Sequence, residues 1–500
     1  GGVGGGGASA PATLHPLAPA AGAVAALMGT WWITEALPLA ATALIPMAVF
    51  PLLGVLPMKA AAAPYADPIV FLFLGGFFIQ RAMERWGLHT RLSLLIMRSA
   101  GGSPGGLIAG VMGATAFISL WISNAATAAM MLPIAVSLAQ AFERALNAPF
   151  GPGTGESSAR PSHPPYAVRN FGLALMLGVA YAATIGGLGT PIGTAPNMLL
   201  LGAMNKQGVG VPFGQWMLIH IPLVIALLAF TWVLVVKVLH PTHVRRVPGG
   251  REMIEKQLRD LGPMSRGEWS VLIVFLGAAA LWISREPLCA ALGLMDGKEA
   301  HLTDGGVAIL AGLALFVIPV NWRRGEFVLN WEWASKINYG VLLLFGGGLS
   351  LAEAISKTQI DAAMGSALGG LHGLSPLVLV LIVTTCTVFL SELVSNTALV
   401  ATLLPASVAA ASALHVHPLL VCLPMALGAS TAFMMPAGTP PSAIVFSSGY
   451  LSIPLMARAG IFLNIASIVL VTLTAYYLAP VVMGVDLLTP LAAPPPSPAP

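Results

Sequence analysis

Two Ser-Asn pairs stand inside long apolar stretches of the sequence, where hydrogen-bonding side chains are unusual. The first pair is Ser123 and Asn124 in SLWISNAATAAMMLP, and the second is Ser395 and Asn396 in SELVSNTALVATLLP. Each pair has a serine four positions before it and a proline ten positions after its own serine: Ser119 and Pro133, Ser391 and Pro405. Hydroxyl and amide oxygens are hard, neutral ligands that suit Na⁺, and an amide NH₂ group donates to anions. The pattern indicates a site that binds a cation and an anion together.

A Gly-Thr motif interrupts an apolar segment downstream of each pair. The two motifs are LGTPIGTAP at 188–196 and MPAGTPPS at 435–442. Glycine freedom and prolines without an N–H group break a helix there, and broken helices at membrane depth offer N–H groups to anions and carbonyls to cations. We therefore expect two oxygen-lined cation sites that frame one anion. They consist of Ser119, Ser123, Asn124 and Gly193 in the first half, and of Ser391, Ser395, Asn396 and Gly438 in the second.

The motifs contain no basic residue, and we expect no Arg, Lys or His beside the anion. A dianion would then depend on helix dipoles, hydroxyls, amides and the bound cations for compensating charge. This gives a physical reason for coupling, because the anion site lacks compensation without the cations.

Structural roles compete with this interpretation. Ser and Asn often hydrogen-bond neighbouring helices in membranes, and Ser-Asn at a helix start is a common N-cap. A single pair would be interpreted in that way. Two copies with matched serines, prolines and Gly-Thr breaks favour the binding site.

Glu392 lies three residues before Ser395, whereas the other acidic residues near spans lie toward their ends. Two roles remain open for Glu392: a structural carboxylate satisfied by the hairpin backbone, or a coupling residue.

The histidines and the three cysteines show no metal-ligand spacing, and no P-loop, dinucleotide motif or nucleophile motif is present. ATP-driven transport and enzyme chemistry therefore have no support.

The composition places these motifs in a membrane. The 500-residue chain is 57% hydrophobic and 8% charged, with a mean hydropathy of +0.85, whereas soluble domains carry about 25% charged residues. Apolar stretches near 20 residues recur, which predicts an all-α polytopic membrane protein. The expected helices cover 20–33, 36–55, 67–86, 88–99, 105–122, 127–146, 170–188, 196–206, 213–239, 268–284, 304–320, 338–356, 376–394, 396–413, 418–435, 441–453 and 460–482.

The two halves of the chain match at fixed offsets. The Ser-Asn pairs are 272 residues apart, as are Gly75 and Gly347, and the Gly-Thr breaks pair at an offset of 245. The difference comes from an extra loop at 147–168. If 105–146 and 376–413 are re-entrant hairpins, 18 of the 23 Lys and Arg residues fall inside, as the positive-inside rule requires. The halves are then inverted repeats, whose paired interruptions point to a transporter's binding site.

The chain resembles the divalent anion/sodium symporter family, which includes sodium–dicarboxylate and sodium–sulfate cotransporters. The resemblance is carried by WWITEALPLAATALIPMAVFPLLGV (31–55), VFLFLGGFFIQRAME (70–84), SLWISNAATAAMMLPIA (119–135), IGGLGTPIGTAPN (185–197), LLLFGGGLSLAEAI (342–355), SELVSNTALVATLLP (391–405) and MMPAGTPPSAIVFSSG (434–449). It implies two inverted repeats with paired re-entrant hairpins and discontinuous helices, an elevator mechanism and a homodimer. It also implies the two Na⁺ sites given above, and anion contacts from Ser123, Asn124, Thr194, Ser395, Asn396, Thr397, Thr439 and Pro440.

This resemblance divides the chain into scaffold and transport regions. The expected organisation is a flexible or truncated leader at 1–19, scaffold helices at 20–104, a transport part at 105–240, a cytoplasmic linker at 241–267, scaffold helices at 268–373, a transport part at 374–484 and a disordered tail at 485–500. The transport parts contain hairpins 105–146 and 376–413, broken helices 170–206 and 418–453, and final spans 213–239 and 460–482.

Three features depart from the family pattern. The family reads Ser-Asn-Thr in both hairpins, but Ala125 follows the first pair, so one hydroxyl expected at a carboxylate is absent and Ala125 is a candidate for specificity. Ser442 replaces the asparagine usual after the second break. Relatives begin with one more spanning helix, which suggests a fragment or a shortened member.

We therefore predict a secondary transporter, not an enzyme, for Na⁺-coupled symport of a small divalent anion. The favoured substrate is a C4-dicarboxylate such as succinate, malate or fumarate, with Na⁺ as coupling ion and no organic cofactor or nucleic-acid partner. The predicted location is a bacterial inner membrane. The alternatives are symport of sulfate or another inorganic divalent anion, Na⁺-independent dicarboxylate exchange and cation/proton antiport through Glu392. A channel or a structural membrane protein would not need the paired breaks.

Overall fold

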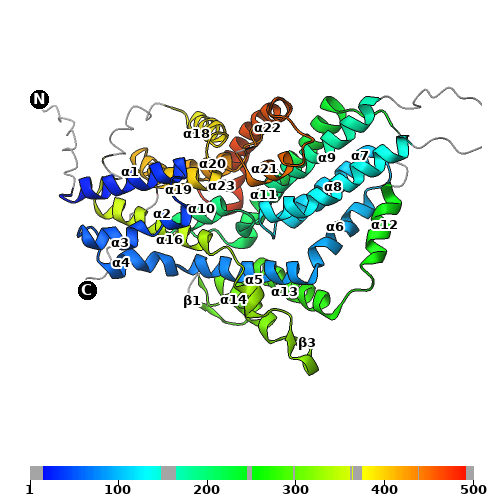
Figure 1. Ribbon diagram of the computed structural model, residues 1–500. Coiled ribbons are helices and arrows are strands. Elements are labelled where there is room, and N and C mark those ends of the chain that lie inside the picture. Colours follow the sequence, from blue (N-terminus) through cyan, green and yellow to red (C-terminus); the bar gives the residue numbers. More distant parts are fainter. Residues whose placement is uncertain are drawn as a thin grey trace, which may run out of the picture.

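The computed structural model describes residues 15–147, 165–244, 250–296, 299–360, 363, 374–436 and 438–490. These residues are helical apart from short turns, connections and two small strand pairs (Figure 1). Eight helical segments among them are long and apolar enough to cross a membrane: Met58–Trp86, Asn124–Arg144, Tyr166–Gly186, Phe213–Leu239, Arg266–Ala291, Tyr339–Lys357, Asn396–Ala413 and Ile453–Met483. The prediction of an all-α polytopic membrane protein is confirmed. Most of the predicted leader (1–19), extra loop (147–168) and tail (485–500) lies outside the described residues.

The first half of the chain runs from α1 to α11 and is followed by α12. These helices are α1 (Ala18–Thr34), α2 (Leu39–Thr42), α3 (Ile45–Leu52), α4 (Met58–Ala62), α5 (Pro68–Trp86), α6 (Leu88–Ser99), α7 (Pro104–Ser119), α8 (Asn124–Asn147), α9 (Pro165–Gly186), α10 (Ala195–Lys206), α11 (Phe213–Trp232) and α12 (Gly250–Asp260). Short 3₁₀ turns form at Ala63–Ala66 and Pro191–Gly193, and a π-helical segment, Val233–Leu239, extends α11.

The second half contains the counterparts of these elements. Its helices are α13 (Arg266–Ala291), α14 (Asp304–Val317), α15 (Trp331–Ala334), α16 (Tyr339–Lys357), α18 (Pro376–Leu390), α19 (Asn396–Ala413), α20 (Leu419–Ala429), α21 (Pro440–Phe446), α22 (Ile453–Leu473) and α23 (Ala479–Met483). A π-helical segment, Thr474–Leu478, follows α22, just as one follows α11. Two antiparallel strand pairs, β1 (Met295–Asp296) with β2 (Glu299–Ala300) and β3 (Pro319–Asn321) with β4 (Glu326–Phe327), flank α14.

Both Ser-Asn helix pairs start with the same Ser-Pro signal. The hydroxyl of Ser103 accepts a hydrogen bond of 3.1 Å from the N–H of Gly106, and that of Ser375 accepts one of 3.4 Å from Val378. A proline follows each serine, at a position where the missing N–H costs nothing. In each half, both helices of the pair then pack on the first part of the broken helix: α7 and α8 on α9, α18 and α19 on α20. Figure 1 shows α7, α8 and α9 side by side at one end of the molecule.

The paired glycines of the two halves make equivalent close contacts. A Cβ on Gly75 of α5 would clash with the backbone of Ala308 on α14, and a Cβ on Gly347 of α16 would clash with the carbonyl of Ala43, between α2 and α3. Each glycine thus permits an element of the other half to approach closely. The repeat seen in the sequence is therefore also a repeat of packing.

Several expected helices differ from the structure in their bounds, such as 441–453, which ends at Phe446, and 268–284, which extends to Ala291. Two of the differences have a clear cause. The segment 36–55 is split into α2 and α3, because Pro46 has no N–H group to continue the first helix, and the carbonyl of Ala43 accepts a hydrogen bond from the Tyr65 hydroxyl. The segment 418–435 is helical only to Ala429, for a reason that lies in the site described below.

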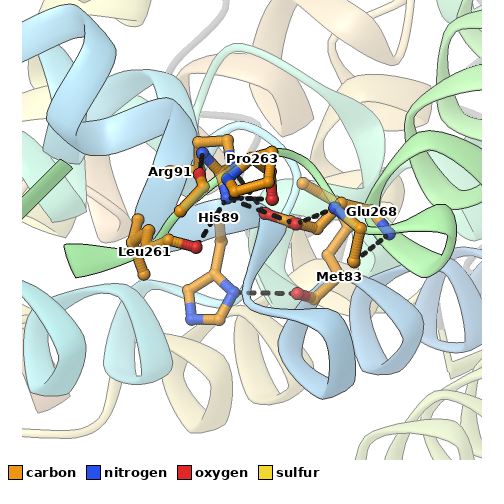
Figure 2. Close-up of polar contacts among 8 residues, drawn as sticks. Met83, His89, Arg91, Leu261, Pro263 and Glu268 are labelled. Carbon is orange, nitrogen blue, oxygen red and sulfur yellow. Dashed lines mark hydrogen bonds and ion pairs between the residues drawn. The ribbon is translucent and has the colours of Figure 1, made fainter. Parts of the chain in front are cut away.

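A buried ion pair ties α6 to the start of the second half. Nε of Arg91 lies 2.6 Å from Oε1 of Glu268, and both side chains are 8% exposed. The guanidinium also donates to the carbonyls of Gly262, Leu261 and Pro263, at the turn between α12 and α13 (Figure 2). The helix α12 lies within the segment 241–267 that was expected to be a linker, and the turn after its C-terminus holds it to α6.

Candidate functional site

Both Ser-Asn motifs and both Gly-Thr breaks line one cavity of about 290 Å³. Its wall contains all eight residues predicted to contact the anion: Ser123, Asn124, Thr194, Ser395, Asn396, Thr397, Thr439 and Pro440. Ala125 and Gly193 line the same cavity. The structure therefore brings four separate segments together, although whether they bind an anion remains a prediction.

Four helices begin at this cavity. α8 starts at Asn124 and α19 at Asn396, while Thr194 and Thr439 immediately precede α10 and α21. The N–H groups in the first turn of a helix have no partner within the helix and carry partial positive charge. Their convergence offers hydrogen-bond donors and dipoles to a small anion.

We call the two Ser-Asn pairs, at the turns between α7 and α8 and between α18 and α19, the tips. An oxygen cluster of the first half lies behind the tip at Asn124. Ser119 is fully buried, and its hydroxyl oxygen lies 2.8 Å from Oδ1 of Asn124 and 2.6 Å from the carbonyl oxygen of Ala183. One hydroxyl proton can serve only one of these acceptors at full strength, so oxygen lone pairs outnumber protons. A Cβ on Gly187 would clash with the Asn124 amide, and one on Gly193 would lie 2.5 Å from the Gly187 carbonyl oxygen. Glycine at both positions keeps the cluster compact.

The second half has a corresponding but differently bonded cluster. Ser391 is fully buried, and its hydroxyl donates to the carbonyl of Val388, 2.9 Å away. Oδ1 of Asn396 is buried without a hydrogen-bond partner among the described residues. A Cβ on Gly438 would lie 3.3 Å from both the Ser391 carbonyl oxygen and Oε2 of Glu392. The orphaned amide oxygen is an acceptor that a bound cation would satisfy.

The donor atoms of both clusters fit Na⁺, since they are hard hydroxyl, amide and carbonyl oxygens. The predicted cation residues fall into two groups. Ser119, Ser391 and Gly438 are buried outside the cavity lining, whereas Ser123, Asn124, Gly193, Ser395 and Asn396 belong to it. The second group could therefore contact a cation on one side and an anion on the other.

Different side chains hold the two breaks. In the first break, the amide of buried Asn197 donates to the carbonyls of Gly187 and Thr190, at 3.0 and 2.9 Å. Ser442 occupies the equivalent position in the second break, and its hydroxyl oxygen accepts a hydrogen bond of 2.9 Å from Thr439. Replacing asparagine by serine removes the longer reach of the amide, so the second break needs another support.

Glu392 supplies that support. Its carboxylate accepts hydrogen bonds from the N–H groups of Phe433, Met434 and Met435, at 2.7, 2.9 and 2.9 Å, and from the amide of Asn464 at 2.8 Å. These peptide groups follow the end of α20 and have left the helix ladder, which explains why the helix stops short of residue 435. Of the two roles considered for Glu392, the geometry matches the structural one, but the peptide donors belong to the second break and not to the hairpin backbone as expected.

The family model for the sodium:sulfate symporter transmembrane region matches residues 8–485. The chain belongs to this family. The sodium-dependent dicarboxylate transporter SdcS of Staphylococcus saprophyticus is 40% identical over 471 residues, which cover 94% of this chain and 88% of that protein. The transporter of the same name from Staphylococcus aureus strain USA300 is 39% identical, with 94% and 87% covered. The resemblance found in the sequence is confirmed, and the chain is a multi-pass cell-membrane transporter.

A solved structure shares the fold of this symporter-family chain. The YdaH transporter of Alcanivorax borkumensis, whose crystal structure is described as revealing an unusual topology, superimposes with a TM-score of 0.54. The match covers 91% of this chain and 98% of YdaH at 13% sequence identity. The likeness therefore concerns the architecture alone.

One expectation about this symporter-family site is wrong. Arg81 of α5 lines the cavity, although no basic side chain was expected beside the motifs. Phe77, Gln80, Asn338 and Val341 of α5 and the α16 region line it too. These residues were not predicted because they lie far from the Ser-Asn pairs in the sequence. The available signal was an arginine within an apolar span, which by default suggests a function.

Proposed function

We propose that this protein is a secondary transporter that couples the inward movement of Na⁺ to the symport of a small divalent anion, with a C4-dicarboxylate as substrate. The observation that carries the proposal is the convergence of both Ser-Asn tips and both Gly-Thr breaks on one cavity. An oxygen cluster behind each tip supplies a candidate Na⁺ site. Transport leaves the substrate chemically unchanged, so the protein would act without enzymatic conversion.

Coupling follows from the charges around the cavity. A dianion needs compensating positive charge, which four helix starts supply only in part and which Arg81, already paired with Glu84, does not supply in full. Two Na⁺ ions held by Ser119, Asn124 and the Gly193 loop, and by Ser391, Asn396 and the Gly438 loop, would supply the remainder. Because the tip residues would contact both the Na⁺ ions and the anion, bound Na⁺ would strengthen the binding of the anion, and the bound anion would strengthen the binding of Na⁺.

The relatives favour a dicarboxylate as the substrate. Two proteins that share 39–40% of their residues with this chain are named sodium-dependent dicarboxylate transporters. A cavity of about 290 Å³ lies at the small end of ligand pockets, which suits a short-chain acid. Sulfate remains the competing substrate because Ala125 supplies no hydroxyl beside Asn124.

An elevator-type movement is the proposed transport step. One wall of the cavity comes from α5 and the start of α16, and the opposite walls come from the two tips and breaks. If α5 and α16 belong to a fixed scaffold, a sliding movement of the tips would carry the site across the membrane. We propose a homodimer as the assembly in which the scaffold stays fixed.

Proteoliposomes provide the test. Uptake of labelled succinate should rise steeply with an inward Na⁺ gradient, and should fall to the level of protein-free vesicles when choline replaces Na⁺. Competition by succinate, sulfate and citrate then ranks the substrates. Equal uptake in choline would reject Na⁺ coupling and favour an exchanger, and strong inhibition by sulfate alone would reject the dicarboxylate. Recovery of the labelled acid unchanged from the vesicle lumen checks that no conversion occurs.

A further inference from the structure

Arg81 stands between two neighbouring cavities. It lines the cavity of the Ser-Asn tips together with Ala125 and Ala126, and it lines a second cavity together with Glu84 and Ala126. Its side chain is 25% exposed. The arginine is therefore beside the first Ser-Asn tip, on the side of the site where Ala125 stands in place of a threonine.

The guanidinium of Arg81 has spare hydrogen-bonding capacity. Nη1 lies 2.5 Å from Oε2 of Glu84, which is its one hydrogen-bond acceptor among the described residues. Gln80 donates to the other oxygen of that carboxylate, at 2.9 Å. Because a guanidinium carries five N–H donors, most of them remain available for a second acceptor. A carboxylate in the tip cavity would be such an acceptor, and planar forks of this kind bind carboxylates well.

We infer that Arg81 is a specificity-determining residue, which binds the second charged group of the anion and replaces the hydroxyl contact that Ala125 lacks. This inference rests on the proposed function, because it assigns a role within the same anion site. Helix N-termini and amides can hold one carboxylate, and a fixed positive charge at Arg81 favours anions with two negative charges over those with one.

Glu84 allows a test in which two substitutions should change the preference for dianions in opposite directions. As the existing partner of Arg81, its carboxylate competes with the anion for the guanidinium. Removing the arginine should weaken the preference for dianions, whereas neutralising Glu84 should strengthen it. A merely structural ion pair would respond differently, because loss of either partner would then damage the site in the same direction.

The experiment compares a dianion with a monoanion of similar size and shape. Sodium-driven uptake of labelled succinate is measured at pH 7.5 in proteoliposomes, with unlabelled succinate or its monoamide, succinamate, as competitor. The unaltered protein should prefer succinate by tenfold or more. R81Q should reduce this preference by about tenfold, since that factor equals about 1.4 kcal/mol and one charge-assisted hydrogen bond contributes that much. E84Q should raise it several-fold.

Matched variants separate the inference from general effects. R98Q makes the same change at an exposed arginine of α6 outside both cavities, and should leave the preference unchanged. The double variant R81Q/A125T gains a hydroxyl beside Asn124 and should recover part of the preference lost in R81Q. E84Q keeps Arg81 in place, so it remains informative even if R81Q does not fold.

The outcomes are distinct. The role of Arg81 would be overturned if R81Q weakened the binding of succinate and succinamate equally, so that the preference for succinate stayed unchanged. A lowered preference for succinate in E84Q would overturn it too. Either result would leave the proposed transport intact. Absence of sodium-dependent uptake in the unaltered protein would instead reject the proposed function, and this inference with it.

Discussion

The side-chain amide of Asn464 on α22 donates a hydrogen bond of 2.8 Å to Oε1 of Glu392, in the turn between α18 and α19. Three consecutive peptide N–H groups, from Phe433 to Met435, point at the same carboxylate. One acidic side chain thus joins the second Ser-Asn tip, the second break and the final long helix. A buried carboxylate with this many donors is well stabilised, and it fixes the geometry of the tip.

Glu392→Gln should therefore destabilise the protein although it changes the shape little. The amide NH₂ group of glutamine cannot accept hydrogen bonds, so at least one peptide N–H group near Met435 would lose its partner in a partly buried environment. We expect a loss of about 3 kcal/mol in the free energy of unfolding, measured as a lower unfolding temperature in detergent. Glu332→Gln, the same change at an exposed carboxylate, is the control. Asn464→Leu should produce a smaller loss, since it removes a single donor.

The same variant tests proton coupling. If the folded E392Q protein still takes up succinate with unchanged Na⁺ dependence, protonation of this carboxylate is not part of the transport cycle. An unaltered unfolding temperature would contradict the structural role argued here.

Ser119→Ala should raise the Na⁺ concentration needed for half-maximal uptake. The variant removes the hydroxyl oxygen that lies 2.8 Å from Asn124 Oδ1, and so removes one candidate ligand from the first cluster. A rise of about three- to tenfold corresponds to the loss of one ligand worth roughly 1 kcal/mol. Ser391→Ala should cause a smaller rise, because the Ser391 hydroxyl already donates to the carbonyl of Val388 in its own helix.

The measurement is a Na⁺ titration of uptake at saturating succinate. Ser137→Ala on α8, a serine outside the cavity and both oxygen clusters, controls for the loss of a hydroxyl. Identical Na⁺ curves for S119A and the unaltered protein would exclude Ser119 as a ligand.

The sequence was sufficient to locate the tips and breaks, because the matching residues occur twice. Ser103 and Ser375, at the starts of the two hairpins, have the same offset and the same capping role. The lining by Arg81 and the four donors to Glu392 could not be predicted in this way. They depend on how α5, α20 and α22 pack against the tips, and no local pattern in the sequence encodes that packing. The split at 36–55 was missed because it depends on a tertiary contact: the Tyr65 hydroxyl donates to the carbonyl of Ala43, which lies between α2 and α3.

Arg91→Met should destabilise the connection between the two halves. The substitution leaves Glu268 as a buried carboxylate without its counter-charge, and the carbonyls of the turn at Leu261, Gly262 and Pro263 lose their donor (Figure 2). Removal of one partner of a buried pair costs about 3–5 kcal/mol. The capping hydrogen bonds between Ser265 and Glu268 would remain, so α13 should keep its start.

Arg251→Met is the matched control for Arg91→Met. Arg251 pairs with Glu255 at 2.9 Å, but its side chain is 59% exposed, and such pairs contribute about 0–1 kcal/mol. Thermal unfolding in detergent should therefore separate the two variants clearly. Similar unfolding temperatures for R91M and R251M would show that the buried pair contributes no more than a surface one.

His240 predicts a pH dependence of stability in mildly acidic solution. This residue follows the π-helical end of the α11 span and is 7% exposed. Burial, with Arg169 and Arg458 nearby, lowers its pKa from 6.5 to about 4. The folded protein therefore resists protonation at this site, whereas the unfolded chain takes up a proton near pH 6.5. Stability is fully present above pH 6.5 and is lost as the pH falls toward 4, by about 1 kcal/mol after allowance for solvent access.

His240→Gln should flatten this part of the pH profile. Between pH 7.5 and 4.5, the unfolding temperature of the unaltered protein should fall more steeply than that of the variant, because glutamine takes up no proton in either state. Burial also lowers the pKa of His417, so some acid sensitivity will remain, and the informative quantity is the difference between the two profiles. Parallel profiles over the whole range would mean that His240 binds its proton equally well in the folded and unfolded chains, and would contradict the buried, neutral state of this histidine.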